Sequence, residues 1–290
     1  MKLINLILIT LISFSAYSCS KDSSTPDPEI PGQGGEEKPV DQNSGTIVVM
    51  SYNTRHSAPY YGTSGDTQAN EQGIADVIKS KSAHIVCLQE IDSCNSRTSY
   101  VDQAKKIAQL AGYPYYSFFS IMDYRGGKYG LATLSNKQMT DVTTLKMPKE
   151  YNGTAITSNS SAGCVTINVD GKNVRVINVH LSLYENERNA QLQYLYDKVI
   201  KTTTMPTLIC GDFNGVRNSS TFNLILSLGF TPSNLDPTNY TIPSTGPNRE
   251  IDYITYAPED SWEVKSHMVI TGTNASDHLP IVSVLKLKTK

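Results

Sequence analysis

The chain has 290 residues, of which 39% are hydrophobic and 18% are charged, and its formal net charge is -2. This length suits one large domain or two small ones, and the composition is that of a soluble globular protein. The net charge is close to zero. Overall charge therefore does not attract this protein to nucleic acid or to an anionic membrane surface.

The first 18 residues predict a signal peptide. Lys2 supplies a positive start, Leu3–Phe14 is almost wholly apolar, and small residues follow up to Ser18. The apolar run is too short to span a bilayer comfortably, which is typical of a secretory signal. Cys19 comes directly after a small residue and resembles the first mature residue of a bacterial lipoprotein, which carries the lipid anchor. The alternative is an ordinary secreted protein in which Cys19 has no such role.

Residues 19–45 are rich in Pro, Gly, Ser and acidic residues. Two lysines stand against six acidic residues in this stretch, and almost nothing in it could be buried in a core. We expect a disordered tether. If Cys19 is lipidated, the protein is exported and anchored to the cell envelope, in the periplasm or at the cell surface, and the tether holds a nearly neutral domain, residues 46–290, away from the membrane.

Short apolar runs and longer amphipathic runs follow one another through residues 46–290, and they predict strands and helices respectively. Strands are expected at Ile47–Tyr52, Ile85–Gln89, Tyr115–Ser120, Tyr129–Ser135, Val142–Lys146, Cys164–Val169, Val174–His180, Thr207–Cys210, Ile251–Tyr256, Trp262–Val269 and Ile281–Leu287. Helices are expected at Gln68–Lys79, Tyr100–Ala111, Asn186–Thr202 and Ser220–Leu228. Strands outnumber helices, and Asp170-Gly171-Lys172-Asn173 is a hairpin signal between two of them. The pattern favours an α+β sandwich of mixed sheets with helices outside, rather than a doubly wound parallel sheet.

Polar side chains follow several of these predicted strands. They are Asn53, Glu90, His180, Asp212 with Asn214, Asp252, and Asp277 with His278. Each one alone is as easily a turn residue or a solvated strand end, but their joint occurrence after apolar runs indicates a site.

Several carboxylates with an amide, and neither a thiolate cluster nor a Cys/His pairing, favour a hard divalent ion over zinc. We expect Mg²⁺, with Mn²⁺ as the alternative ion. A hard metal beside acids and imidazoles is suited to phosphoester cleavage. The metal neutralises the phosphate, a carboxylate takes a proton from water, and hydrogen-bond donors stabilise the developing charge.

Six motifs in this order resemble those of the endonuclease/exonuclease/phosphatase superfamily, and together they span residues 46–288. They are Ser-Tyr-Asn at 51–53, Leu-Gln-Glu at 88–90, Asn-Val-His at 178–180, Gly-Asp-Phe-Asn at 211–214, Ile-Asp-Tyr-Ile at 251–254 and Ser-Asp-His-Leu-Pro at 276–280. The resemblance implies a four-layer αββα sandwich of two mixed, mainly antiparallel sheets, with the site at one edge of both sheets. It also implies a metal-dependent phosphoric ester hydrolase that uses no covalent enzyme intermediate.

The resemblance also implies a role for each motif residue. Glu90 would be the principal metal ligand, with Asn53 and Asp277 assisting. Asp212 would orient or deprotonate the attacking water, and Asn214 would hold the phosphate and Asp212. His278 would contact the phosphate, held and polarised by Asp252. His180 would be a second phosphate donor or the acid for the leaving group.

The sequence departs from the family pattern in two places. Deoxyribonuclease-like members have a further glutamate that supports the first histidine, and the sequence offers no clear equivalent. Leu131 stands where many relatives have Asn, which questions a substrate role for that position. Arg97, shortly after Glu90, is a candidate phosphate-binding residue, and an exposed surface arginine is the equal alternative.

Three hypotheses about function remain open from the sequence. The first is a phosphoesterase for a small or lipid-linked phosphoester outside the cytoplasm, acting as a monomer. The second is a nuclease of the same fold. Binding to nucleic acid relies on neutralising phosphates, and the sequence shows no dense Lys/Arg run for it. The third is a surface-anchored binding protein on a decayed enzyme fold, although all the catalytic motif residues are present.

Overall fold

A computed structural model describes residues 45–63 and 67–288 of the chain. The predicted signal peptide at 1–18, the predicted lipidation of Cys19 and all but the last residue of the predicted tether lie outside the described residues. Among the described helices, none has both the length and the apolar character that a membrane crossing needs.

Two six-stranded sheets form the body of the domain. The first has the strand order β13-β14-β1-β2-β4-β3, and the second has the order β11-β12-β10-β9-β8-β5. The strands of the first sheet are β1 (Thr46–Asn53), β2 (Ile85–Ser93), β3 (Tyr115–Tyr124), β4 (Gly127–Ser135), β13 (Trp262–Val269) and β14 (Ile281–Leu287). Those of the second are β5 (Met139–Lys146), β8 (Ser161–Val169), β9 (Lys172–His180), β10 (Thr207–Asp212), β11 (Thr231–Pro232) and β12 (Asp252–Ala257). The short strands β6 (Glu150–Tyr151) and β7 (Thr154–Ala155) pair separately.

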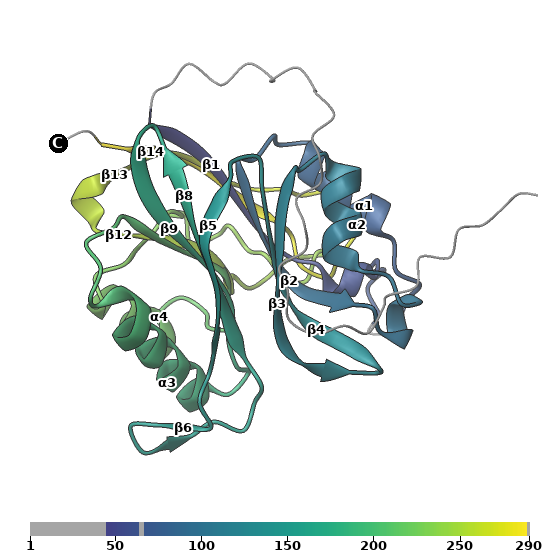
Figure 1. The fold of residues 1–290 in the computed structure, drawn as a ribbon, viewed down its shortest axis with the longest axis horizontal. Coiled ribbons are helices and arrows are strands. Elements are labelled where there is room, and N and C mark those ends of the chain that lie inside the picture. Colours follow the sequence, from purple (N-terminus) through teal and green to yellow (C-terminus); the bar gives the residue numbers. More distant parts are fainter. Residues whose placement is uncertain (1–44, 64–66, 289–290) are drawn as a thin grey trace, which may run out of the picture.

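Helices cover the two outer faces of this sandwich. They are α1 (Glu71–Lys79), α2 (Gln103–Ala111), α3 (Glu185–Leu195) and α4 (Ser220–Ser227). Figure 1 shows α1 and α2 on one side of the paired sheets and α3 and α4 on the other. The predicted four-layer αββα sandwich is confirmed.

Alternation along the strands builds the three hydrophobic layers. In β1, Ile47 and Val49 point into the core between the sheets, whereas Met50 and Tyr52 point into the layer under α1 and α2. In the second sheet, Ile209 of β10 belongs to the layer under α3 and α4. Successive side chains of a strand face opposite sides, so a strand covered on both faces is apolar throughout. This explains why the strands read as continuous apolar runs.

Each sheet contains one parallel pair among antiparallel neighbours. These pairs are β1 with β2 and β9 with β10. Strands that run parallel end at the same edge of a sheet, so the residues that follow β1, β2, β9 and β10 are brought together. The helices that connect these strands lie on the outer faces and leave that edge open.

The predicted helix starts differ from the structure by a few residues for a local reason. Helix α1 begins at Glu71, not at Gln68, because the Asn70 side chain accepts a hydrogen bond from the Gly73 N–H and caps the helix. Helix α2 begins at Gln103, not at Tyr100, because Asp102 caps it in the same way. Polar capping residues end the irregular segment before each helix.

Candidate active site

Three site residues of the second sheet lie side by side in the strand register. His180 at the end of β9 is opposite Asp212 at the end of β10, and Asp212 is opposite Asp252 at the start of β12. Adjacent strands in a sheet are about 4.8 Å apart, so paired residues can interact directly. The three motifs, which are far apart in the sequence, therefore meet because of strand pairing.

Gly211 makes this close approach possible. Its φ is +154°, and a Cβ atom at this position would overlap the Val179 carbonyl oxygen. Any larger residue would push β10 away from β9 at the point where Asp212 and His180 must meet. The glycine of the Gly-Asp-Phe-Asn motif is therefore required by packing between strands.

The first sheet contributes Asn53 and Glu90. A bulge interrupts the β2–β4 register between Leu88 and Ile91, and Glu90 inside it has a φ of +57°. An extra residue in a strand changes which way the next side chain points. The bulge thus re-aims Glu90 toward the shared edge, where its Oε1 accepts a hydrogen bond from Asn53 Nδ2 at 3.1 Å.

Asn53 joins the two halves of the site. Its Nδ2 also donates to Asp212 Oδ2 at 3.1 Å, across the gap between the sheets. Ser276 holds the Asn53 backbone, because its Oγ donates to the Asn53 carbonyl oxygen at 2.7 Å. The predicted metal ligand Glu90 and the predicted base Asp212 therefore both accept hydrogen bonds from the side-chain amide of Asn53.

Asp212 is a buried carboxylate with several donors around it. Its Oδ1 accepts the Asn214 N–H at 2.8 Å, and its Oδ2 lies 3.6 Å from His180 Nε2 and 3.7 Å from His278 Nε2. Burial raises the pKa of Asp212, and the charge of Asp252 adds to the rise, while both imidazoles oppose it. A carboxylate with a raised pKa is a stronger base toward a water proton.

His278 and Asp252 form a buried pair. His278 Nδ1 hydrogen-bonds Asp252 Oδ2 at 2.9 Å, and Thr241 Oγ1 donates to the same oxygen at 2.6 Å. Burial alone would lower the pKa of His278. Asp252, and then Asp212 and Asp277, outweigh burial and raise the pKa to about 10. His278 is thus a cation at neutral pH, held in place to donate from Nε2.

Asp277 and Glu90 fit a site for a hard cation. Burial raises the pKa of Asp277, and the charge of Glu90 raises it further, whereas His278 and Arg55 lower it. The Arg55 Nε is 3.8 Å from Asp277 Oδ2. These two carboxylates, together with the Asn53 side-chain amide, are oxygen donors of the kind that Mg²⁺ prefers.

Asp212, Asp252 and His278 also lie close enough to one another to hold a metal ion. The geometry gives these residues a different role. His278 Nδ1 is already hydrogen-bonded to Asp252 Oδ2, and Thr241 Oγ1 donates to the same oxygen. The donor set predicted from the sequence, Glu90, Asp277 and Asn53, offers oxygen atoms alone and stays a prediction.

Arg97 lies beside the site rather than within it. Its Nε and Nη2 donate to Asp92 at 2.9 and 2.8 Å, and its guanidinium packs over the rings of Tyr124 and Tyr129. The alternative of an exposed surface arginine is wrong, because only 17% of the side chain is accessible. Its role in phosphate binding stays a prediction, since Asp92 balances its charge.

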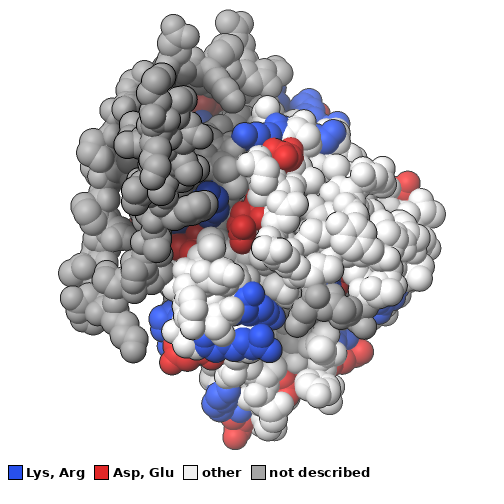
Figure 2. Space-filling view, turned by 90° about the vertical axis from the view of Figure 1, so that its right-hand side faces the viewer, with Lys and Arg blue, Asp and Glu red and all other residues white. Residues whose placement is uncertain are grey.

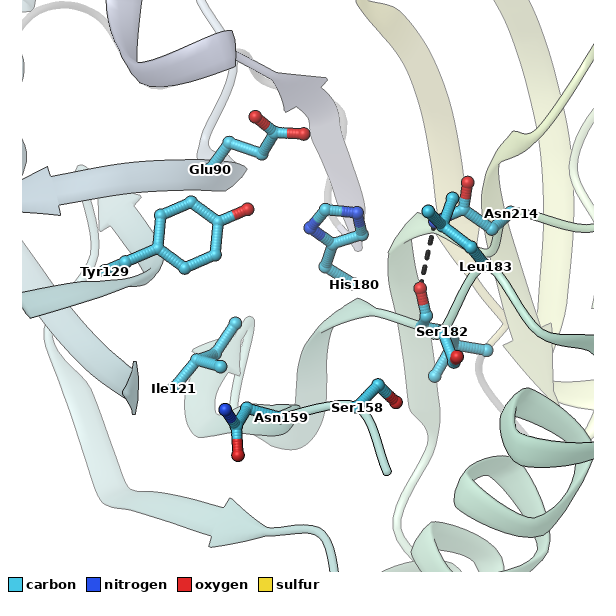
Figure 3. Close-up of a pocket in the computed structure, with 10 residues that line it drawn as sticks. Glu90, Ile121, Tyr129, Ser158, Asn159, His180, Ser182, Leu183 and Asn214 are labelled. Carbon is cyan, nitrogen blue, oxygen red and sulfur yellow. Dashed lines mark hydrogen bonds between the residues drawn. The ribbon is translucent and has the colours of Figure 1, made fainter. Parts of the chain in front are cut away.

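A cavity of about 300 Å³ opens from the site (Figure 3). The site residues Glu90, His180 and Asn214 line it, and the rest of its wall consists of Ile121, Tyr129, Ser158, Asn159, Leu181, Ser182 and Leu183. The Tyr129 hydroxyl points into the space between Glu90 and His180. Burial, followed by the charge of Glu90, raises the pKa of Tyr129 well above its usual value, so the hydroxyl remains a neutral donor.

The sequence did not identify this wall. Within the strand Tyr129–Ser135, comparison with the family pattern drew attention to Leu131 and not to Tyr129. The structure buries Leu131 completely in the core between the sheets. Strand alternation was the signal that could have identified Tyr129. Residues two apart in a strand face the same side, so Tyr129 faces the same side of its sheet as Leu131. Ser158 and Asn159 carry no local signal of this kind.

Glu187 is a second residue whose importance the sequence did not indicate. Its carboxylate accepts hydrogen bonds from the N–H and hydroxyl groups of Thr157 and Ser158, and from the Ser182 hydroxyl. It therefore ties the segment before β8 to the segment after β9, and both segments form the cavity wall. It is not the family glutamate that supports the first histidine. Among the described residues, the only carboxylate in ion-pair range of His180 is Asp212.

Comparison with known proteins agrees with the geometry. A family model described as "Endonuclease/Exonuclease/phosphatase family" matches residues 50–278. A search of curated proteins finds no match.

Solved structures share the fold at low sequence identity. An endonuclease/exonuclease/phosphatase from Beutenbergia cavernae is 22% identical with a TM-score of 0.65, over 83% of this chain and 72% of that one. The human Nocturnin catalytic domain with a bound sulfate anion is 20% identical with a TM-score of 0.64, over 84% and 96%. A mannosyl-6-phosphatase from Bacteroides thetaiotaomicron is 17% identical with a TM-score of 0.61, over 82% and 99%.

Proposed function

The chain belongs to the endonuclease/exonuclease/phosphatase family, and on that premise we propose that it hydrolyses a small or lipid-linked phosphoester outside the cytoplasm, with Mg²⁺ as cofactor. The family assignment confirms the predicted superfamily and the prediction of a hydrolase. The observation that carries the proposal is the Asn53 amide, which bonds both Glu90 and Asp212 at 3.1 Å. Asn53 thus holds the predicted metal ligand and the predicted base close to each other, one on each side of its amide nitrogen.

Asp212 acts as the base in the proposed reaction. It takes one proton from a water molecule, whose oxygen attacks phosphorus in line with the bond that breaks. The Asn214 N–H holds Asp212 Oδ1, and Asn53 holds Oδ2, so the carboxylate has a fixed orientation. The products are the free alcohol and a phosphate that has gained the oxygen of the water.

The histidines act on the phosphate and on the leaving oxygen. His278 donates from Nε2 to a phosphate oxygen, and the Asp252 carboxylate keeps it protonated and aligned. His180 faces the cavity, which favours the role of acid for the leaving oxygen. Donors that are already positioned where negative charge develops stabilise the transition state.

Glu90, Asp277 and Asn53 would hold the metal. When bound there, Mg²⁺ or Mn²⁺ would neutralise the phosphate oxygens and the developing negative charge. The Asn53 side-chain oxygen accepts a hydrogen bond from the Arg55 N–H at 3.1 Å. Its second lone pair would be the one that binds the metal.

Surface charge supports a small substrate over a nucleic acid. On the face shown in Figure 2, Lys and Arg side chains of the described residues form small separate groups with acidic residues among them. A nucleic-acid surface needs a continuous set of cations to neutralise phosphates. The structural neighbour named as a mannosyl-6-phosphatase supports the same substrate class.

The proposed location rests on the N-terminal sequence. Leu3–Phe14 followed by Cys19 supports export and lipid anchoring, and residues 19–45 would then separate the enzyme from the membrane. A change of Cys19 to Ser should move the protein from the membrane fraction to the soluble fraction. Membrane association that persists in this variant would contradict the lipid anchor.

Release of phosphate from phosphomonoesters, release of alcohol from phosphodiesters and cleavage of plasmid DNA together test the activity of the full chain with Mg²⁺. We expect turnover of small esters that Asp212→Asn and His278→Ala abolish. The control Asp141→Asn makes the same change at an exposed position and should leave activity intact. Salt-sensitive cleavage of plasmid DNA in preference to small esters would favour the nuclease. No hydrolysis together with no Mg²⁺ binding by calorimetry would favour the non-catalytic binding protein.

A further inference from the structure

The cavity beside the site has a direction relative to the reaction. Asp212 is only 1% exposed and does not line the cavity, whereas Glu90, His180 and Asn214 do. In an in-line displacement, the attacking water and the leaving oxygen lie on opposite sides of phosphorus. With the water held at Asp212, the leaving group extends away from it, and this cavity is the space beside the site that the described residues leave for it.

The wall of this cavity carries no ionisable group apart from the Tyr129 phenol, which stays neutral. Beyond the three site residues, its apolar surface comes from Ile121, Tyr129, Leu181 and Leu183, and its polar surface from neutral hydroxyl and amide groups of the described residues. A charged substituent placed there would lose hydration, and the one cation bonded to the wall, Lys149 among the described residues, is already engaged by Asn159 Oδ1. The wall therefore disfavours a leaving group that bears a further phosphate or carboxylate.

The free polar groups of the wall are few and well placed. The Ser158 hydroxyl is already committed, because it donates to Glu187 and accepts from Gln191 Nε2. Asn159 differs, since its Oδ1 accepts from Lys149 at 2.9 Å while its Nδ2 meets only the weak acceptor Met122 Sδ at 3.6 Å. The Tyr129 hydroxyl points into the cavity. These groups can bond the hydroxyls of a ligand whose carbon skeleton contacts the apolar surface.

The size of the cavity limits the ligand. About 300 Å³ is at the lower end of the range for small-molecule sites, which is enough for one ring and not for a polymer segment. We propose that this cavity is the leaving-group subsite, and that it selects an uncharged, hydroxyl-bearing alcohol about the size of one sugar ring. This inference rests on the proposed function, because it assumes that Asp212 activates the water.

Substrates of equal carbon number test the selectivity directly. Glucose 6-phosphate presents a neutral ring, 6-phosphogluconate is an open chain with a carboxylate at C1, and glucitol 6-phosphate is the neutral open-chain control. With the full chain and Mg²⁺, we expect kcat/KM to be about tenfold or more higher for glucose 6-phosphate, mainly through KM. Phenyl phosphate, which has a ring but no hydroxyls, should also be the poorer substrate.

Asn159→Lys reverses the charge preference if the wall contacts the leaving group. We expect this variant to gain activity toward 6-phosphogluconate, through a lower KM, and to lose it toward glucose 6-phosphate. The control Asn173→Lys adds the same charge at an exposed position at the opposite end of β9 and should leave both KM values unchanged.

The outcomes separate this inference from the proposed function. Hydrolysis of phosphoesters without preference for the neutral sugar ester, or with phenyl phosphate as the best substrate, would overturn the subsite and leave the proposed function standing. An unchanged preference in Asn159→Lys would also overturn it. Failure to hydrolyse any ester in the presence of Mg²⁺ would overturn both.

Discussion

The floor of the active site and the wall of its cavity are built on opposite principles. The floor consists of Asn53, Asp212, Asp252 and His278, which are all at most 5% exposed and are bonded to one another across the two sheets. The wall is neutral, and Glu187 ties together the two of its segments that contain Ser158 and Ser182. Charges fixed in a buried position stabilise a transition state, whereas a neutral wall shapes what can enter. Changes in the floor should therefore act on kcat, and changes in the wall on KM.

The largest effect is expected at Asp212, the proposed base. Asp212→Asn keeps the size of the side chain and removes its ability to take a proton. We expect kcat to fall about 10³-fold or more, within the upper range for loss of a general base, and KM to change little. Steady-state phosphate release measures both constants. A fall confined to KM would assign Asp212 to the substrate-binding groups and break the contrast between floor and wall.

The next effect concerns the pair of Asp252 and His278. Because Asp252 hydrogen-bonds His278 at 2.9 Å and is proposed to act through it, the two changes should not add. We expect Asp252→Asn to lower kcat by about 10²-fold, His278→Gln by somewhat more, and the double variant to be no worse than His278→Gln. Additive losses would show that Asp252 has a separate role in the reaction.

A smaller effect is expected directly beneath the floor, where Gln89 and Asn178 bridge the two sheets. Gln89 Nε2 donates to Asn178 Oδ1 at 2.8 Å, and both side chains are fully buried. Gln89→Leu leaves that oxygen without its donor, so the free energy of unfolding should fall by about 2 kcal/mol. Urea denaturation measures the loss. Unchanged stability would mean that the bridge contributes nothing to holding the two sheets together.

The smallest effect is expected in the wall, at Glu187. Burial would raise the pKa of Glu187, but the hydrogen bonds from Ser158 and Thr157 outweigh it and lower the pKa to about 2. A carboxyl whose pKa is lower in the folded state than its ordinary value of 4.5 stabilises the fold above about pH 4.5 and loses this contribution as the pH falls toward 2. Glu187→Gln should therefore cost about 1 kcal/mol at pH 7 and less at pH 3.

Urea denaturation at the two pH values measures this difference, and KM for a small ester should rise a few-fold in the same variant. A stability difference that is the same at both pH values would rule out the ionised form of Glu187 as the group that ties the wall together.

The same contrast explains how far the sequence alone can predict this molecule. The floor residues follow apolar strands in recognisable motifs, so the strands and residues such as Asp212 and His278 can be located from the sequence. Tyr129, Asn159 and Glu187 belong to ordinary patterns. Glu187 lies in the first turn of α3, where a solvated acidic side chain interacts favourably with the helix dipole. Its role in holding the cavity wall depends on tertiary contacts that the sequence does not show. The bond from Arg97 to Asp92 likewise depends on how the segment after β2 folds back.

The position of β1 in the first sheet has a consequence for how the protein is made. This first strand lies between β2 and β14, and β14 is the last of the described strands. Until Ile281–Leu287 has been synthesised, β1 has one edge without a partner, and the layer between the sheets lacks Leu285 and Leu287. The domain therefore cannot complete its core while these residues are still to be added. Folding must wait for this strand, and a ribosome that stops early releases a polypeptide with an open sheet edge, which is the form most exposed to aggregation and to proteases.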